Sequence, residues 1–507
     1  MEELEQRAQR IAWLQELRAR GIDPYAVERY PRTATAQQIL ADDQSFTGVS
    51  VRAAGRLVAV RIMGKASFAH IQDETGRIQI YVKRDVVGDD AYERFKQLHI
   101  GDILGVEGEV FRTRTGEITI QAASYTLLAL CFRPLPIGKE RDGRHYSGLQ
   151  DVELRYRMRY VDLLANPEAR AILVKRIKLV QAIRRYLDSR GFLEVETPVL
   201  QAEAGGAAAR PFRTHHNALD TDFKLRISLE LYLKRLIVGG FEKVYEIGRV
   251  FRNEGISTRH NPEFTLLELY QAYANLEDME DLVEDMYVAV ATAVNGSPRF
   301  LTRTPGGAEV EVDFSQRPWP RIPILEGIRR YASIEPQELA DLQSARSAAA
   351  RAGLCVESEH TLGGIIEKLH EHFTQPHLIH PTFITDFPVE TSPLAKKHPD
   401  NPSLTRRFEV YAATQELGNA FSEINDPLDQ RERFANQLAQ RAAGDEEAHP
   451  MDEDFIRALE YGMPPTGGLG IGIDRLAMVL TGASSIRDVI FFPLLRPERS
   501  PMPNASQ

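Results

Sequence analysis

The stretch that decides the fold is residues 244–270, VYEIGRVFRNEGISTRHNPEFTLLELY. Its first eight residues have the composition of a β-strand. Two-residue alternation then places four side chains on one face of a second strand: Phe264, Leu266, Glu268 and Tyr270. The connection between them contains glycine, asparagine and proline and is too long for a tight turn. The stretch therefore predicts an antiparallel hairpin with a long loop.

Cationic side chains gather in that loop, at Arg252, Arg259 and His260. A guanidinium suits bidentate binding of a phosphate or carboxylate, and it can also stack on a base. A charged loop at a sheet edge is the plainer interpretation of such residues taken alone. Because Glu268 and Tyr270 lie further along the strand, we expect a pocket for a ligand with separate charged ends.

The composition is that of a globular protein with several units. A chain of 507 residues is too long for one core, so two to four units are expected. No apolar run is long enough to cross a membrane, and the charged start does not resemble a signal peptide. The two cysteines, Cys131 and Cys355, lack metal-ligand spacing and fit a reducing cytoplasm. A net charge of −10 argues against indiscriminate nucleic-acid binding.

The N-terminal part predicts a helical segment, residues 1–45, and then a small barrel, residues 46–132. Five strands are expected in the barrel, with a helix at 90–98 between the third and the fourth: 51–61, 67–72, 77–82, 103–111 and 117–127. This order is typical of an OB-type barrel, which binds oligonucleotides on its second and third strands.

Those two strands carry side chains that suit RNA: Phe68, His70, Gln79 and Tyr81. Residues 51–84 hold seven Lys or Arg against only Asp73 and Glu74. Aromatic rings beside a basic groove are what single-stranded nucleic acid requires. The alternative is a small barrel that packs these rings inward.

A linker is expected at residues 133–168, where Gly138 and Gly143 interrupt the pattern. A long helix at 169–190 follows, and then an edge strand at 192–198, where a proline is tolerated. A helix that leads into an exposed strand fits a dimer interface or ordinary core packing, and both interpretations stay open.

Residues 416–423 do not form a plain core strand. Asn419, Phe421 and Glu423 alternate onto one face, and a buried unpaired carboxylate is very costly. This face is therefore either solvated or binds a cation, which can be a metal, an ammonium group or both. Glu416 and Glu423 are hard oxygen ligands of the kind that magnesium takes.

Three weaker signals complete the pattern. Small residues at 205–209 and at 467–472 let a ligand approach bare backbone, and Arg475 follows at a helix start. The glycine spacing is not that of the dinucleotide fingerprint. Glu230 opens a helix, where capping is its plainer role. Five histidines are interpreted as surface residues rather than metal ligands: His360, His370, His372, His377 and His380.

Together these motifs resemble those of the class II aminoacyl-tRNA synthetases. Residues 251–264 are similar to their motif 2, residues 470–475 to motif 3, and the helix that ends at 196–198 to motif 1. An OB barrel in front of such a domain is the arrangement of the aspartyl, asparaginyl and lysyl subgroup. Three runs are similar to bacterial lysyl-tRNA synthetases: 61–68, 251–270 and 416–426.

The resemblance covers nearly the whole chain and is weakest between residues 275 and 380. It implies an α+β multidomain fold in which an OB-fold barrel precedes an antiparallel sheet flanked by helices. The catalytic domain would span residues 169–507, with a helical insertion at about 296–380.

The resemblance also implies a role for each matching position. The ATP-binding residues would be Arg252 at the α-phosphate, Glu254 near the adenine amino group, His260 at the outer phosphates, Phe264 stacked on adenine, and Arg475 near the γ-phosphate, with Arg252 and Arg475 catalytic. The lysine-binding residues would be Gly206, Glu230, Glu268, Tyr270, Asn419, Phe421 and Glu423. Of these, Glu230 and Glu423 would bind the side-chain ammonium and Glu268 the α-amino group. Magnesium would be bound by Glu416 and Glu423, and the anticodon by Arg61, Phe68, Gln79 and Glu117.

The implied activity is that of a cytoplasmic, homodimeric lysine–tRNA ligase. It activates L-lysine with ATP and Mg²⁺ to lysyl-adenylate and transfers the lysyl group to the 3′ end of tRNA(Lys). Positioning and charge neutralisation suffice for both steps, so no protein nucleophile is expected.

The alternatives are an aspartyl- or asparaginyl-tRNA synthetase, a paralogue that lysylates a protein, and a non-catalytic RNA-binding relative. A pocket for an acidic side chain would place arginine or lysine where this chain has Glu230, Phe421 and Glu423. The barrel with its RNA-binding residues argues against a protein-lysylating paralogue. A non-catalytic relative would be expected to lose an ATP arginine or a magnesium carboxylate.

Overall fold

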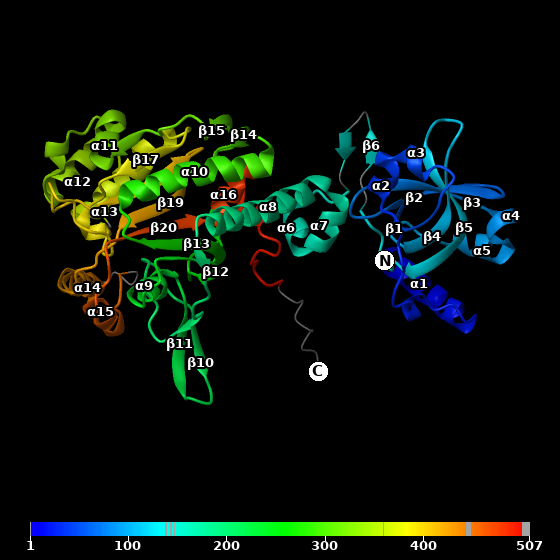
Figure 1. Cartoon of the computed structure of the whole chain (residues 1–507), viewed down its shortest axis with the longest axis horizontal. Helices are drawn as coiled ribbons and strands as arrows, with labels where there is room; N and C mark the ends of the chain where they lie inside the picture. Colours follow the sequence, from blue (N-terminus) through cyan, green and yellow to red (C-terminus); the bar gives the residue numbers. More distant parts are fainter. Residues whose placement is uncertain are drawn as a thin grey trace, which may run out of the picture. The chain divides into compact units, whose positions relative to one another are not determined.

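The computed structural model divides into two compact units, residues 1–166 and residues 167–507 (Figure 1). It describes residues 2–136, 139–141, 144–146, 148–357, 359–442 and 448–498. Gly138 and Gly143, which were expected in the linker, lie outside the described residues. Within the described ranges, no helix combines the length and the apolar character that crossing a membrane requires.

The first unit is built on a closed barrel of five strands in the order β1-β2-β3-β5-β4. The strands are β1 (Ser50–Met63), β2 (Ala66–Gln72), β3 (Arg77–Lys83), β4 (Ile103–Arg112) and β5 (Ile118–Ala129). The remaining elements of this unit are α1 (Glu2–Ala19), η1 (Pro24–Ala26), α2 (Ala36–Ala41), α3 (Asp43–Phe46), α4 (Arg84–Val87), α5 (Asp89–Phe95), β6 (Lys139–Arg141), β7 (Arg144–Tyr146), α6 (Val152–Arg157) and α7 (Arg159–Ala165). Five strands with α5 between the third and the fourth confirm the predicted OB-type barrel.

The N-terminal helix is part of this unit because its apolar stripe is covered. Leu14 and Leu17 of α1 are buried with Leu130, just after β5. Arg10 forms a buried ion pair with Asp102, with 2.5 Å between Nη2 and Oδ1. The predicted helical segment thus packs on the chain of the barrel through these two leucines.

The second unit is built on a sheet of eight strands in the order β16-β17-β18-β19-β20-β13-β12-β8. In that order they span Arg321–Pro323, Thr382–Thr385, Arg407–Ala412, Gln415–Ser422, Thr466–Gly472, Glu263–Ala272, Lys243–Phe251 and Leu193–Glu194. The predicted hairpin is β12 with β13, and its register pairs Val250 with Phe264.

The sheet is mixed rather than purely antiparallel. Its two outermost strands, β8 and β16, pair in parallel with their neighbours, and the six inner strands are antiparallel. Parallel neighbours need a long crossover connection. Such connections are present here, since α9 lies between β8 and β12, and three helices lie between β16 and β17.

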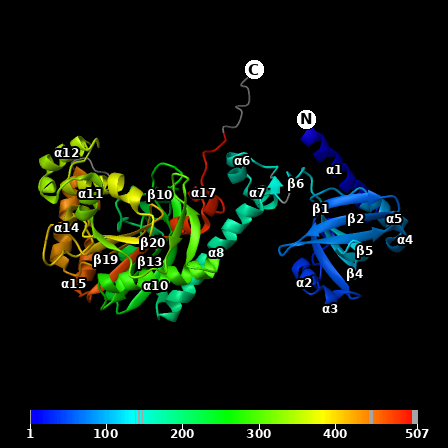
Figure 2. The ribbon, with the colours of Figure 1, turned by 90° about the horizontal axis from the view of Figure 1, so that it is seen from above.

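Helices cover the sheet and flank it. They are α8 (Pro167–Ser189), α9 (Glu230–Val238), α10 (Leu276–Asn295), α11 (Ile324–Ala332), α12 (Leu342–Arg351), α13 (Leu362–Leu369), α14 (Pro427–Ala442), α15 (Glu453–Glu460), α16 (Ile473–Thr481) and α17 (Ile486–Val489), with short turns η2 (Pro336–Leu339), η3 (His370–Thr374), η4 (Gln375–His377) and η5 (Val389–Thr391). Figures 1 and 2 show α8 and α10 side by side along the sheet. With α16 they bury one face in the largest core.

Residues 296–380 are only partly helical. The first part is the hairpin β14 (Arg299–Arg303) with β15 (Glu309–Asp313), and then β16 joins the main sheet. The predicted helical character is found in α11, α12 and α13 and in the short turns η2, η3 and η4, and the three helices share a core of their own. The structure also corrects one histidine, because His370 is buried among them rather than exposed.

A smaller sheet, in the order β10-β11-β9, completes the second unit. Its strands are β9 (Leu200–Gln201), β10 (Arg213–His216) and β11 (Thr221–Leu225). This sheet precedes α9, the helix that opens with Glu230.

Candidate active site

One cavity of about 1090 Å³ opens on the face of the main sheet opposite α8 and α10. It brings together every position predicted for ATP, lysine and magnesium: Gly206, Glu230, Arg252, Glu254, His260, Phe264, Glu268, Tyr270, Glu416, Asn419, Phe421, Glu423 and Arg475. These residues come from segments far apart in the sequence. Their convergence in one cavity is the main observation on which the site depends.

Strand β13 builds one wall by simple alternation. Leu267 and Leu269 are fully buried in the core beneath the sheet. On the opposite face of the strand, Phe264, Glu268 and Tyr270 line the cavity. The sequence predicted this face correctly because β13 is regular along its whole pairing with β12 and β20.

Strand β19 builds the next wall, and a bulge changes its alternation. Val410 pairs with Gly418 whereas its neighbour Tyr411 pairs with Glu416, so Leu417 is an extra residue. Leu417 packs in the core, and Glu416 lines the cavity on the same face as Asn419, Phe421 and Glu423. Without the bulge, two-residue alternation would direct Glu416 away from the three residues that follow.

One end of the cavity is cationic and open to solvent. Arg252 lies over the ring of Phe264, with 5.1 Å between the guanidinium carbon and the ring centroid. Arg475 Nη1 donates to Glu416 Oε2 at 2.6 Å, and Nη2 lies 3.4 Å from His260 Nε2. Burial opposes the charge on Arg475, but Glu416 outweighs it and raises the pKa of this guanidinium.

At this end of the cavity, a neutral His260 lies beside the charged Arg475. Burial lowers the pKa of His260, and the neighbouring Arg475 lowers it further, so the imidazole is neutral at pH 7. Glu254 lies exposed on the same loop. Two arginines beside an aromatic ring suit a nucleotide, because they can bind phosphate oxygens while the ring stacks on the base.

The other end of the cavity is acidic and closed. Glu268 is buried and accepts three hydrogen bonds, from Ser228 Oγ at 2.8 Å, from the Leu229 backbone N–H at 3.1 Å and from Tyr270 Oη at 3.2 Å. Burial raises its pKa to about 7, and the nearby Glu230 contributes in the same direction.

Lys234 lies at the closed end, between two carboxylates. Its Nζ forms ion pairs with Glu230 and with Glu423, and its side chain has no exposed surface. Burial raises the pKa of Glu423 to about 8 although Lys234 lowers it. Among the described residues, neither Glu423 oxygen accepts a hydrogen bond of good geometry, so this carboxylate has capacity for another donor.

Two glycines make room for these acids. A Cβ on Gly468 would lie 2.0 Å from Glu423 Oε1, and a Cβ on Gly206 would lie 2.7 Å from Ser228 Oγ. Gly206 also has a φ of +89°, which side chains rarely adopt. Any larger residue at position 468 would therefore displace the Glu423 carboxylate.

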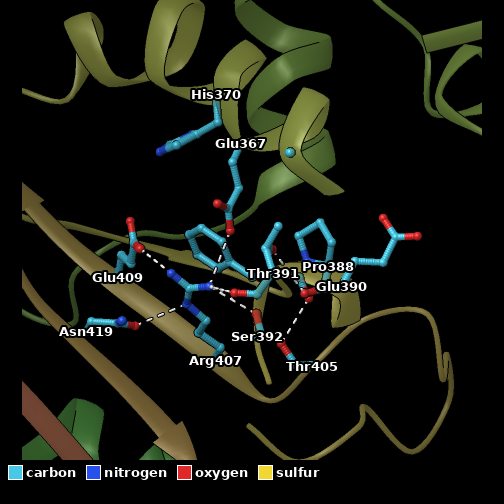
Figure 3. A network of polar contacts seen from close by, with 12 residues as sticks. Glu367, His370, Pro388, Glu390, Thr391, Ser392, Thr405, Arg407, Glu409 and Asn419 are labelled. Atoms are coloured by element: carbon cyan, nitrogen blue, oxygen red, sulfur yellow. Dashed lines mark hydrogen bonds and ion pairs between the residues drawn. The ribbon is translucent and has the colours of Figure 1, made fainter. Parts of the chain in front are cut away.

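A buried arginine, Arg407 of β18, holds the strand that carries Asn419 and Phe421 (Figure 3). Its Nε donates to Asn419 Oδ1 at 3.1 Å, and its guanidinium carbon lies 5.8 Å from the Phe421 ring centroid. Figure 3 also shows its contacts with Glu367 and Glu409, at 3.3 and 2.5 Å.

Among the residues that sequence reasoning missed are Arg407 and Glu409, which line the cavity, and Lys234, which pairs with two of its carboxylates. Lys234 follows Glu230 by one helical turn, a spacing that brings two side chains together. This spacing predicts that Glu230 and Lys234 interact. It does not predict that Lys234 is buried, because its second partner, Glu423, comes from another part of the chain. Arg407 and Glu409 are two residues apart in β18 and both face the cavity, and this two-residue alternation is visible in the sequence.

In the barrel unit, the predicted RNA face lies on the outside of β1, β2 and β3. Register pairs Phe68 with both Arg61 and Tyr81, and Phe68 stacks on Tyr81 with 4.5 Å between centroids. Neither ring is part of the barrel core, so inward packing of these aromatics is excluded. Glu117 Oε2 accepts from Gln79 Nε2 at 2.7 Å, which places both beside the stacked rings.

Comparison with known proteins agrees with this arrangement. Residues 151–496 match the family model of tRNA synthetases class II (D, K and N), and residues 51–128 match that of the OB-fold nucleic acid binding domain. The lysine–tRNA ligase of Pelotomaculum thermopropionicum is 54% identical over 486 residues, which are 96% of this chain and 93% of that protein. The lysine–tRNA ligase of Bacillus subtilis is 50% identical over 490 residues, 95% of each chain.

Two independent matches thus cover the two structural units in the order in which they occur, and the full-length relatives span both. The chain therefore belongs to the class II aminoacyl-tRNA synthetases of the aspartate, lysine and asparagine group, and within this group to the lysine–tRNA ligases.

Proposed function

We propose that the protein activates L-lysine with ATP and transfers the lysyl group to the 3′ end of tRNA(Lys). The observation that carries the proposal is the closed acidic end of the cavity, where Glu230, Glu268 and Glu423 lie next to an open end with Arg252 and Arg475. The relatives that share nearly the full length of this chain have the name lysine–tRNA ligase.

The acidic end explains which amino acid is chosen. Its carboxylates are buried, so an amino acid without a distal ammonium would leave them unpaired on binding. A site built for a polar group rejects ligands that lack it by roughly 10⁴-fold. Aspartate and asparagine have no distal ammonium that would neutralise Glu423, and aspartate would add a further negative charge.

The open end supplies the chemistry of activation. We propose that Arg252 binds the α-phosphate and that Arg475 and His260 hold the outer phosphates, while Phe264 stacks on adenine and Glu254 accepts from its amino group. A lysine carboxylate oxygen then attacks the α-phosphorus in line, and pyrophosphate leaves. In the second step, a ribose hydroxyl of the tRNA end attacks the carbonyl carbon of the adenylate, and AMP leaves. The arginines stabilise the charge that develops on the phosphate oxygens.

Magnesium fits the boundary between the two ends. Glu409 and Glu416 both raise the pKa of Glu371, after burial, so negative charge is concentrated here. No group of three or more His, Cys, Asp or Glu in the described ranges is placed to hold a metal. Magnesium does not require one, because it uses one or two carboxylates together with waters and phosphate oxygens. We propose Glu416 and Glu409 as its protein ligands. The bound ion would neutralise phosphate charge.

Glu423 was the second carboxylate predicted for magnesium, and we propose that it serves the amino acid instead. It contacts the Lys234 ammonium, and both side chains are closed off from solvent. A divalent metal ion beside the buried Lys234 ammonium would be repelled by it.

The proposal includes tRNA binding and a dimer in the cytoplasm. Arg61, Phe68, Gln79 and Glu117 on the outer barrel face are proposed to read the anticodon. A dimer interface around motif 1 is supported by apolar side chains that are exposed in the single chain: Val174, Ile177, Leu193, Val199 and Leu200. Phe68→Ala should raise the KM for tRNA about tenfold, because base stacking contributes about 1–3 kcal/mol, and it should leave pyrophosphate exchange unchanged.

The direct test is ATP–pyrophosphate exchange with lysine, aspartate or asparagine, for the wild type and for Glu423→Gln. Exchange with lysine alone, lost in the variant, is the expected result. Exchange with aspartate or asparagine would place the specificity in a sister branch. Absence of exchange with all three would contradict the synthetase activity.

A further inference from the structure

Lys234 lies against the closed end of the cavity and has no role in the reaction as proposed so far. It is a cation, whereas the amino acid that enters is itself doubly cationic. Its side chain is fully buried, and ion pairs join it to Glu230 of its own helix and to Glu423 at the end of β19. The rings of Tyr270 and Phe455 lie about 6 Å away, at 5.9 and 6.0 Å from Nζ to the centroids.

A count of charges at the closed end shows what this residue does. The buried carboxylates are Glu230, Glu268 and Glu423, and the resident ammonium is Lys234. His449 also lies here, but burial lowers its pKa to about 4, so it contributes no charge at pH 7. Burial raises the pKa of Glu268 to about 7 and that of Glu423 to about 8, so each carboxylate needs a neighbouring cation to be ionised at pH 7. With all three carboxylates ionised, three negative groups against one positive group leave two places for cations, which is the number of ammonium groups on one free lysine.

The hydrogen bonds indicate which carboxylate each of the two cations would pair with. Glu268 is held by three neutral donors and lies where an α-ammonium would complete its partners. Glu423 shares Lys234 with Glu230 and accepts no other hydrogen bond of good geometry from the described residues. The second place is therefore beside Glu423, where a side-chain ammonium of the substrate would share the carboxylates with Lys234.

We propose that Lys234 is a specificity-determining residue, a resident ammonium that limits the closed end of the pocket to two further cationic groups and so fits it to one α,ω-diamino acid. The proposal rests on the proposed lysine activation and assigns to Lys234 a role distinct from that of the carboxylates. Without Lys234, substrate binding would leave one buried carboxylate without a counter-ion, a state that costs far more than an exposed unpaired charge.

The test replaces the resident ammonium by a free one. Lys234→Ala removes three carbons and the amine, which together have the shape of n-propylammonium. We expect the variant to have a KM for lysine raised about tenfold or more in ATP–pyrophosphate exchange, with a smaller change in kcat. Added n-propylammonium should lower this KM again, because it restores the third cation.

The neutral isostere 1-propanol separates charge from volume. It fills the same space without a charge, so we expect it to leave the KM of Lys234→Ala unchanged. Equal rescue by propanol and propylammonium would overturn the proposal, because Lys234 would then act only by filling space. Competition of propylammonium with lysine would also overturn it, since the closed end would then have no third place. A wild-type KM in Lys234→Ala would do the same.

A second pair of variants covers the case in which Lys234→Ala does not fold. Lys234→Arg keeps the charge and should retain a KM for lysine within a few-fold of the wild type, whereas Lys234→Gln should not. Equal losses in both would overturn the proposal. Lys397→Ala is the matched control, because Lys397 pairs with Asp429 at 2.9 Å outside the cavity, and propylammonium should have no effect on it.

The wild type distinguishes a failure of this inference from a failure of the proposed function. Wild-type protein without lysine-dependent exchange would contradict lysine activation itself. Wild-type exchange with an unaffected Lys234→Ala variant would contradict only the role of Lys234.

Discussion

The two ends of the cavity hold charges of similar number in opposite environments. At the open end, Glu254 and His260 are exposed and Arg475 keeps about a third of its side chain in solvent. At the closed end, Glu230, Lys234 and Glu423 are at most 6% exposed. Water and salt screen the first set but not the second. The comparison teaches that, under the proposed function, the open end would bind the nucleotide and the closed end would select the amino acid.

The strongest test of this difference is Glu230→Gln at the closed end. Loss of one partner from a buried ion pair costs about 3–5 kcal/mol, so kcat/KM for lysine should fall by about 10³-fold. The KM for ATP should change little, because the proposed nucleotide site lies at the other end. Steady-state pyrophosphate exchange with each substrate varied in turn measures both, and an equal rise of the two KM values would show that the ends are not independent.

Arg475→Gln should have the next largest effect, and of a different kind. This arginine acts on charge that develops in the reaction, so kcat should fall by about 10²-fold while the KM for lysine stays within a few-fold of the wild type. Pre-steady-state measurement of adenylate formation checks it. A rise in the KM for lysine with kcat unchanged would mean that Arg475 only positions Glu416, its ion-pair partner.

The pH dependence of lysine binding should sharpen the comparison further. Burial raises the pKa of Glu268 from its ordinary value of 4.5 to about 7. Below that pH the carboxyl is protonated and must lose its proton before it can pair with the α-ammonium. The KM for lysine should therefore fall as the pH rises from 6 to 8, by about tenfold for each unit well below the pKa. The KM for ATP provides the reference, and a pH-independent KM for lysine over this range would contradict the assignment.

The same shift predicts how folding stability changes with pH. The folded protein keeps a proton on Glu268 that the unfolded chain has already released, so this group's contribution to stability falls as the pH rises from 4.5 towards 7. Saturating lysine should reduce the loss, because the α-ammonium stabilises the ionised carboxylate. Thermal unfolding with and without lysine at several pH values measures the effect.

The smallest effect is expected from Glu254→Gln, the same chemical change as in Glu230→Gln but at the open end. The amide keeps an acceptor for the adenine amino group, and the lost charge is exposed to solvent. We expect the KM for ATP to rise only about threefold, within the range of a single exposed interaction, and no change in the KM for lysine. A loss as large as that of Glu230→Gln would remove the distinction between the ends.

Regular elements were predictable from the sequence, and irregular ones were not. The alternation of β13 was sufficient to place Phe264, Glu268 and Tyr270 on one face, because nothing interrupts it. The five barrel strands were also predictable, although register shifts interrupt the pairing of β1 with β2 and of β4 with β5. The parallel edges of the main sheet were not, since the direction of β8 and β16 depends on crossovers that local patterns do not encode.

Within the site, the limits of sequence reasoning were set by contacts between distant segments. The apolar spacing of Leu233 and Ile237 indicates a core helix, and Lys234 between them has the pattern of a solvent-facing residue. Its burial follows from Glu423, which reaches it from another strand. The roles given to single residues by the resemblance remain predictions, because a structure places side chains and only kinetics measures what they contribute.

The extra residue in β19 has a consequence for how such proteins diverge and for how they are redesigned. Leu417 interrupts the two-residue alternation of β19. Even-numbered residues before it and odd-numbered residues after it therefore face the cavity. If the bulge were lost and Leu417 were paired as an ordinary strand residue, Glu416 would turn to the opposite face of the sheet, although every acidic residue would still be present in the sequence. Transplanting the specificity of this protein into a sister enzyme thus requires the bulge at Leu417 to be transferred together with the acidic residues.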